Sequence, residues 1–138
     1  MEQFLNVYRN LTLDNLSTLG EIYTEDIRFI DPAHELNGLT VLTSYFKNLY
    51  ENINHIDYDF VHPMRVDGQC YLQWHMRFSH PRLKRGADIT VHGTSFLQFN
   101  SEEKVHFHQD FFDLGSMIYQ HLPLLGTIIK SLNRKLGS

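Results

Sequence analysis

Two polar side chains, His108 and Asp110, stand among aromatic residues and could carry acid–base chemistry. They are two residues apart, so they lie on the same face of an extended strand, and Phe107, Phe111 and Phe112 flank them. A buried carboxylate is costly unless it is paired or hydrogen-bonded, and a histidine on the same strand face supplies such a partner. The pair predicts a proton-transferring site in a pocket, with a purely structural polar pair as the alternative.

A second carboxylate, that of Asp31, stands directly before Pro32. An apolar wall favours the protonated form of a carboxylate, which allows proton transfer near neutral pH. The Asp-Pro sequence is also common in turns, because the aspartate can hydrogen-bond the backbone that follows it. Asp31 is therefore a candidate catalytic residue, with a turn or cap role as the alternative.

Apolar residues at helical spacing predict the helices that would hold these side chains. We expect short helices over residues 2–10 and 13–23, and a longer helix over residues 40–52. The apolar stripe of the longer helix consists of Leu42, Tyr45, Phe46, Leu49 and Tyr50. Between the helices, residues 26–30 alternate as a strand that the following proline ends, and residues 34–38 form a connector.

From residue 56 onward the apolar period changes from 3.6 to 2, which indicates strands. We expect these strands over residues 56–64, 70–78, 88–99 and 104–112. Asp67-Gly68 is a hairpin signal between the first two of them. One face of the second strand carries Cys70, Leu72, Trp74, Met76 and Phe78. Four sequential antiparallel strands beside helices predict a strongly twisted α+β sheet.

The C-terminal tail, residues 114–138, is predicted to be helical, with interruptions at Pro123 and Gly126. Its apolar stripe consists of Leu125, Ile128, Ile129, Leu132 and Leu136. We expect this amphipathic helix to pack on the same domain, over the mouth of a pocket or at a subunit interface. Because the other side of the helix is basic, association with a membrane surface is the weaker alternative.

Size and charge limit the functions open to this chain. Its 138 residues and 16.3 kDa suit one domain with a real core. A net charge of −4 argues against binding to nucleic acid. Cys70 is the single cysteine, so no intrachain disulfide is expected. We find no secretory signal and no apolar stretch of roughly 20 residues, which predicts a cytoplasmic protein.

The order of these elements, together with the motif in residues 23–32, resembles a known fold. In this motif Tyr23, Asp26, Phe29, Asp31 and Pro32 are followed by Gly38 and a helix. The pattern is similar to the cone-shaped fold of nuclear transport factor 2, ketosteroid isomerases and SnoaL-like polyketide cyclases. The resemblance implies a domain over residues 1–113, in which a curved antiparallel sheet wraps round the N-terminal helices and encloses a pocket.

The resemblance to ketosteroid isomerases implies roles for individual residues. The proton-shuttling aspartate of that pattern falls on Asp31, and its tyrosine that donates to an oxyanion falls near Tyr8. Its second acid, on the penultimate strand, falls on Ser95, which is a departure. An uncharged hydroxyl donates a weaker hydrogen bond than a protonated carboxyl, so the sequence does not match the full isomerase pattern.

The resemblance to SnoaL-like cyclases implies a different acid. Those proteins carry an essential acid on the last strand in a His-x-Asp context, which falls on His108 and Asp110. The register of the fold points these two side chains and Phe112 inward, alongside Trp74 and Ser95. The chain thus resembles the cyclases on its last strand and the isomerases on its first.

We therefore expect a pocket for a small, largely apolar organic molecule. Its lining is predicted to be Tyr23, Tyr45, Phe60, Trp74, Met76, Ser95 and Phe112, with Tyr8, Asp31, His108 and Asp110 as the catalytic candidates. The expected chemistry is isomerisation, cyclisation or dehydration without a cofactor or a metal. The alternative is a non-catalytic ligand-binding or protein-association module. We also expect a homodimer that forms through the sheet.

Overall fold

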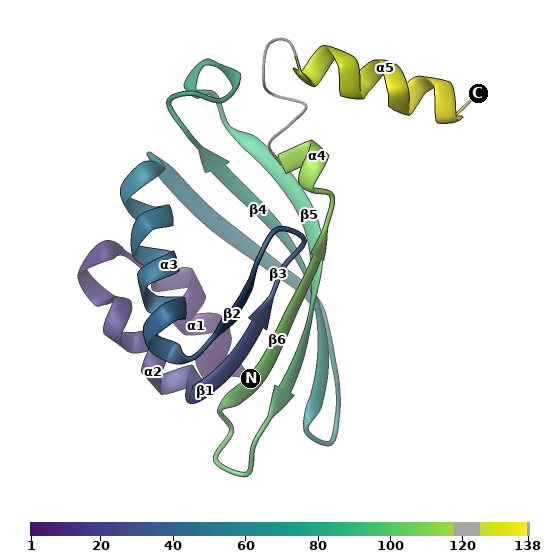
Figure 1. Cartoon of the computed structure of the whole chain (residues 1–138). Coiled ribbons are helices and arrows are strands. Elements are labelled where there is room, and N and C mark those ends of the chain that lie inside the picture. The colour runs from purple at the N-terminus through teal and green to yellow at the C-terminus, as the bar shows by residue number, and fades with distance from the viewer. Residues whose placement is uncertain (118–124, 138) are drawn as a thin grey trace.

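Three helical segments open the chain in the computed structural model, which describes residues 1–117 and 125–137 (Figure 1). Helix α1 (Glu2–Asn10) follows the prediction, and its buried side chains include Phe4 and Tyr8. The predicted helix over 13–23 is instead a 3-10 helix, η1 (Leu13–Thr18), followed by the single turn α2 (Leu19–Ile22). Asn15 leaves helical geometry there, and its side chain accepts a hydrogen bond from the Thr12 N–H at 2.7 Å.

The next segment runs from strand β1 (Tyr23–Ile30) through strand β2 (Glu35–Asn37) to helix α3 (Leu39–Asn52). The predicted connector over residues 34–38 therefore contains a three-residue edge strand, which pairs antiparallel with β1. Three residues are too few for an alternating pattern to be recognised in a sequence. Gly38, with φ of 95°, joins β2 to α3 in a conformation that a side chain would disfavour.

The remaining strands are β3 (His55–Val66), β4 (Gln69–Ser79), β5 (Ile89–Phe99) and β6 (Val105–Phe112), with a short 3-10 turn, η2 (Lys84–Gly86), between β4 and β5. The sheet order is β2-β1-β6-β5-β4-β3. All neighbouring pairs are antiparallel except β1 with β6, which is parallel, so the sheet is mixed. The predicted curved sheet and α+β class are confirmed.

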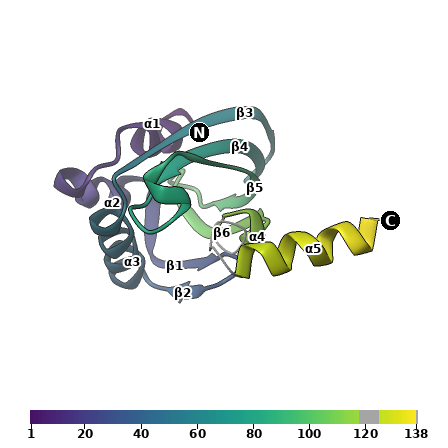
Figure 2. The ribbon, with the colours of Figure 1, turned by 90° about the horizontal axis from the view of Figure 1, so that it is seen from above.

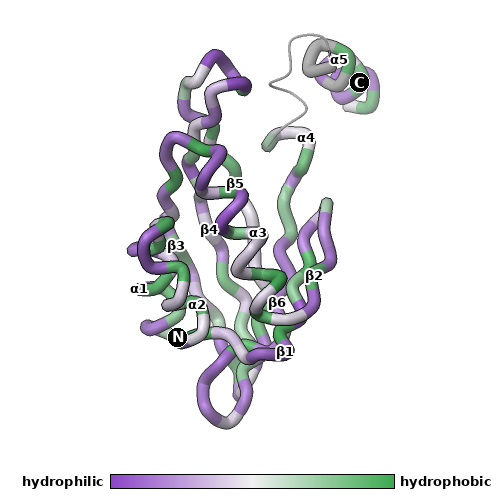
Figure 3. The backbone as a smooth tube through the Cα atoms, turned by 60° about the vertical axis from the view of Figure 1, so that its left-hand side comes forward, coloured by the Kyte–Doolittle hydropathy of each residue, from purple (hydrophilic) through white to green (hydrophobic). Residues whose placement is uncertain are grey.

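The core lies between the concave face of this sheet and α1, α2 and α3, round which the strands curve (Figure 2). Hydrophobic and hydrophilic residues alternate along the strands, as the tube in Figure 3 shows for β4 and β5. Fully buried side chains come from both layers and include Leu19, Ile27, Leu42, Leu72, Leu97 and Val105. The inner face of the sheet is thus available for a core at one end and a pocket at the other.

Two helical pieces form the tail, α4 (Leu114–Met117) and α5 (Leu125–Gly137). Of the two predicted interruptions, Pro123 lies outside the described residues, whereas Gly126 lies inside α5 and does not interrupt it. Helix α5 projects away from the sheet in Figures 1 and 2. The expected packing of this helix on the domain stays a prediction. Within residues 1–117 and 125–137, no helix combines the length and apolar character that a membrane span requires. The cytoplasmic location also stays a prediction.

The conformation of Gly38 generates a test of the β2–α3 junction. Gly38→Ala should lower the free energy of unfolding by about 1–3 kcal/mol, because φ of 95° strains any residue with a Cβ. Gly20→Ala is the matched control, since an added Cβ there would meet only Leu39 Cδ2 at an ordinary 3.7 Å. Urea unfolding measures both variants. Equal stability of the two variants would contradict this account of the junction.

Candidate functional site

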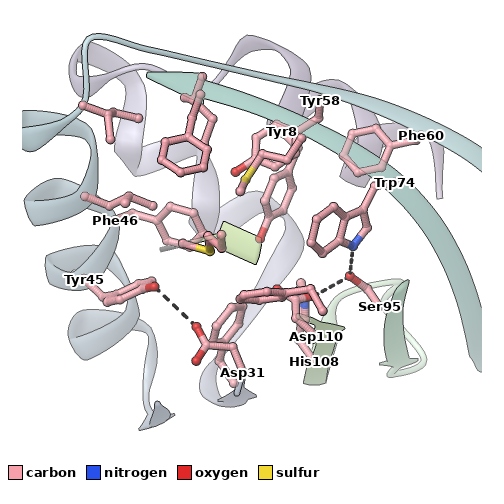
Figure 4. A pocket seen from close by; sticks show the side chains of 18 of the residues that line it. Tyr8, Asp31, Tyr45, Phe46, Tyr58, Phe60, Trp74, Ser95, His108 and Asp110 are labelled. Carbon is pink, nitrogen blue, oxygen red and sulfur yellow. Dashed lines mark hydrogen bonds and ion pairs between the residues drawn. The ribbon is translucent and has the colours of Figure 1, made fainter. Parts of the chain in front are cut away.

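A cavity of about 80 Å³ lies between the concave face of the sheet and helices α1 and α3 (Figure 4). Aromatic and aliphatic side chains make most of its wall. The predicted residues that line it are Tyr8, Asp31, Tyr45, Phe60, Trp74, Met76, Ser95, His108, Asp110 and Phe112. Tyr23, which was predicted to line the pocket, is not a lining residue but lies fully buried behind the wall. The cavity therefore combines an apolar wall with a few polar groups, which is typical of ligand sites.

Asp110 and His108 form the polar centre of this wall. Successive side chains of β6 alternate between its faces, so His108 and Asp110, two residues apart, both point to the concave face. His108 Nε2 lies 2.6 Å from Asp110 Oδ1. The β5–β6 register sets Ser95 opposite Asp110, and the Ser95 hydroxyl donates to the same oxygen. His108 is only 2% exposed, whereas the Asp110 side chain is 17% exposed. Among the described residues none donates a hydrogen bond to Asp110 Oδ2, so this oxygen is available to a ligand.

The indole of Trp74 completes this arrangement from the next strand. Its Nε1–H donates to Ser95 Oγ at 2.9 Å, which turns the single proton of the serine hydroxyl toward Asp110. Trp74 lies over Gly93 of the neighbouring strand, where an added Cβ would come within 2.3 Å of the indole ring. The absence of a side chain at Gly93 thus allows the indole to reach the serine.

Two buried tyrosines extend the network on the other side of His108. The hydroxyl of Tyr23, at the start of β1, lies 2.7 Å from His108 Nδ1, and the Tyr8 hydroxyl lies 2.5 Å from that of Tyr23. Burial is the main cause that raises the pKa of both phenols well above its ordinary value, so both stay protonated at neutral pH. One continuous chain of hydrogen bonds therefore joins six side chains, in the order Trp74, Ser95, Asp110, His108, Tyr23 and Tyr8.

Asp31 lies at another part of the same cavity, and its two oxygens have different surroundings. Oδ1 accepts hydrogen bonds from the backbone N–H groups of Ala33 and His34, at 2.8 and 2.7 Å. Oδ2 accepts one from the Tyr45 hydroxyl at 3.4 Å, and burial together with the Asp31 charge raises the pKa of Tyr45 above its ordinary value. The turn interaction and the pocket position, which the sequence offered as alternatives, therefore coexist in one side chain.

Two features of the site escaped the sequence analysis, namely the link through Tyr23 and the role of Gly93. The available signal for Gly93 was a glycine inside a long alternating strand, which often marks a close approach of another group. No comparable signal existed for Tyr23, because its partners lie 15 and 85 residues away. In the described part of the chain, no three His, Cys, Asp or Glu side chains lie together as metal ligands would.

Comparison with known proteins identifies a family model and solved structures that are similar to this chain. A family model described as the SnoaL-like domain matches residues 3–108. No curated protein matches the chain by sequence.

Several solved structures are similar in fold. A candidate SnoaL-like polyketide cyclase from Shewanella denitrificans OS-217 is 18% identical with a TM-score of 0.71, and the match covers 84% of this chain and 91% of that one. A hypothetical protein with a ketosteroid isomerase-like fold from Catenulispora acidiphila DSM 44928, in complex with trimethylamine, is 17% identical with a TM-score of 0.76 and coverage of 88% and 94%.

An NTF2-like protein of unknown function from Burkholderia pseudomallei K96243 is 13% identical, with a TM-score of 0.74 and coverage of 86% and 93%. At these identities the likeness establishes the shared fold.

The contact between Trp74 and Gly93 generates a test of the wall. Gly93→Ala should displace the indole, break its hydrogen bond to Ser95 and lower the free energy of unfolding by about 1–3 kcal/mol. Trp74 is the single tryptophan, so its fluorescence emission should shift to longer wavelength as the indole becomes more exposed. Ser95→Ala is the control, since it removes the acceptor without adding volume. An unchanged emission spectrum in Gly93→Ala would refute the close approach.

Proposed function

The chain belongs to the SnoaL-like domain family, and on that premise we propose that its pocket binds a small, largely apolar organic molecule and moves a proton on it without a cofactor. One observation carries the proposal. The Asp110 carboxylate has one oxygen held by His108 and Ser95, while no described residue donates to the other, in a wall made mostly of aromatic and aliphatic side chains. Such surroundings suit a group that accepts and returns a proton.

The proposed reaction class is the transfer of a proton beside a carbonyl or hydroxyl group, as in isomerisation, cyclisation or dehydration. Asp110 takes the proton through Oδ2, and His108 holds Oδ1 in position. Asp31, with Oδ2 near Tyr45, provides a second carboxylate in the same cavity. Tyr8 also lines the cavity. Once the His108–Asp110 pair has taken up the proton, Tyr8 can donate to the ligand oxygen on which negative charge develops.

A non-catalytic ligand-binding or protein-association module is the second candidate, and one observation favours it. Ser95 occupies the position of the second acid in the isomerase pattern, and its only proton is committed to Asp110. The strongest donor of that pattern is therefore missing from the wall. Under this reading the polar network orients a ligand and no bond of the ligand is changed.

Exchange of α-protons distinguishes the two candidates without knowledge of the natural substrate. We expect the protein to accelerate deuterium incorporation into 2-indanone in D₂O, followed by NMR, and Asp110→Asn to lose roughly 10²-fold or more of that acceleration. Asp59→Asn, which changes an exposed carboxylate on β3, is the control and should behave as wild type. Binding of 2-indanone with no acceleration by the wild type would favour the non-catalytic candidate. Full acceleration in Asp110→Asn would exclude Asp110 as the proton acceptor.

We also propose that the convex face of the sheet forms a homodimer. This face carries an aromatic patch, defined by Tyr71, Phe96, Phe107 and Phe111, in which Tyr71 is 54% and Phe111 is 50% exposed. Neighbouring rings of the patch lie 4.9 and 6.0 Å apart. Contiguous exposed apolar surface of this kind marks association sites.

Sedimentation of patch variants tests the dimer. The wild type should sediment as a dimer, and Tyr71→Lys with Phe111→Lys should shift it to a monomer, because two buried charges would face the partner copy. Val66→Lys, at a residue that is 75% exposed outside the patch, should remain dimeric. A monomeric wild type at every concentration tested would overturn this proposal.

A further inference from the structure

The direction of the hydrogen bonds along the buried chain is fixed at one end. An indole N–H can only donate, so Trp74 donates to Ser95 and Ser95 donates to Asp110 Oδ1. At the other end, Tyr8 lines the cavity, and its hydroxyl lies 2.5 Å from that of Tyr23. Between these ends stand His108 and Tyr23, and each tyrosine has a single hydroxyl proton to give.

One arrangement follows when the His108–Asp110 pair carries one negative charge. Asp110 then accepts from His108 Nε2–H at 2.6 Å, which leaves a lone pair on Nδ1. Tyr23, 2.7 Å from Nδ1, must donate to it, and its oxygen must accept the proton of Tyr8. The Tyr8 oxygen can then offer only a lone pair to the cavity, so it matches a ligand that donates a hydrogen bond.

The arrangement reverses when the pair holds one more proton. That proton gives either an imidazolium beside a carboxylate, or a neutral carboxyl beside the other imidazole tautomer, and both forms place a hydrogen on Nδ1. Nδ1–H then donates to Tyr23, Tyr23 donates to Tyr8, and the hydroxyl proton of Tyr8 is free to point into the cavity. Tyr8 now matches a ligand that accepts a hydrogen bond.

We propose that Tyr23 is a positioning residue that transmits the proton count of the His108–Asp110 pair to Tyr8. Tyr23 thereby selects between carbonyl-type ligands, which bind with one proton added to the pair, and N–H or O–H donors, which bind without it. The inference rests on the proposed binding of a small molecule in this cavity. It specifies whether the ligand group that meets Tyr8 donates or accepts a hydrogen bond, and it makes this preference depend on pH.

Besides the pair, the titratable groups that the described residues place around the cavity and the pair are Asp31 with His34 and five tyrosines. The tyrosines that surround the cavity and the pair are Tyr8, Tyr23, Tyr45, Tyr50 and Tyr58, from α1, β1, α3 and β3. Burial is the main cause that raises the pKa of each, to about 12 for Tyr50, so all remain neutral below pH 9. The groups that β4 and β5 contribute, Trp74 and Ser95, carry no charge.

Two bicyclic probes of similar size test the selection. 1-Indanone can only accept a hydrogen bond, indole can only donate one, and neither ionises between pH 5 and 9. In the wild type, the ratio of the 1-indanone affinity to the indole affinity should fall by up to about tenfold per pH unit as the pair loses its proton. NMR titration at a series of pH values measures both affinities.

Two variants separate this mechanism from others. Tyr23→Phe keeps the ring but removes the link, so its affinity ratio should not vary with pH. His34→Gln removes a second histidine near the cavity, the one beside Asp31 in the described part of the chain, and should keep the wild-type dependence. A ratio that is constant in the wild type, or one that still varies in Tyr23→Phe, would overturn the inference and leave the proposed binding intact. If neither probe binds, both the inference and the proposed binding fail.

A measurement without ligand guards against a Tyr23→Phe variant that does not fold. The ¹⁵N resonances of His108 in the wild type should show a proton on Nδ1 at low pH and its loss at high pH, with Nε2 protonated throughout or sharing its proton with Asp110. Retention of the Nδ1 proton at high pH would contradict the reversal on which the inference depends.

Discussion

The Asp110 carboxylate imposes the strictest physical demand in this structure. A carboxylate beside aromatic rings has lost much of its water, and the cost is offset only if donors replace that water. Ser95 donates to Oδ1, and His108 does so whenever its Nε2 carries the proton, so each must be held in place. Hydrogen bonds do this: Trp74 orients the serine hydroxyl, and Tyr23 orients the imidazole. The partly buried carboxylate of Asp110 therefore depends on side chains from three further strands, β5, β4 and β1.

The sheet meets this demand through its register. Antiparallel pairing sets Ser95 opposite Asp110, whereas the parallel pairing of β1 with β6 sets Phe29 opposite His108 and carries Tyr23 on the same strand. A slip of one residue in β6 would turn the pair to the convex face, because successive side chains alternate. The parallel β1–β6 contact, the one departure from an antiparallel sheet, is thus what joins the N-terminal tyrosines to the last strand.

The sequence was informative where structure is periodic. Alternation in β6 predicted that His108 and Asp110 share a face, and helical spacing predicted α3 almost to the residue. The sequence-based prediction failed at short or irregular features. These include β2 and the break in β3 near His62, which has φ of 51°. Beyond that break Met64 is 70% exposed, although strict alternation over the predicted strand 56–64 would place it on the same face as Phe60. Irregular features depend on contacts distant in sequence, and so does the link from Tyr8 to Tyr23.

The two carboxylates of the cavity differ in how their surroundings are encoded. Asp31 takes its closest donors from the two residues after Pro32, so a tetrapeptide is nearly sufficient to build its site. Asp110 takes its partners from β5 and β6, and these in turn depend on β4, β1 and α1. The geometry at Asp31 is therefore local, whereas that at Asp110 exists only in the complete sheet. It follows that the proton-transferring half of the proposed site is coupled to the fold as a whole, and that distant residues such as Gly93 bear on its chemistry.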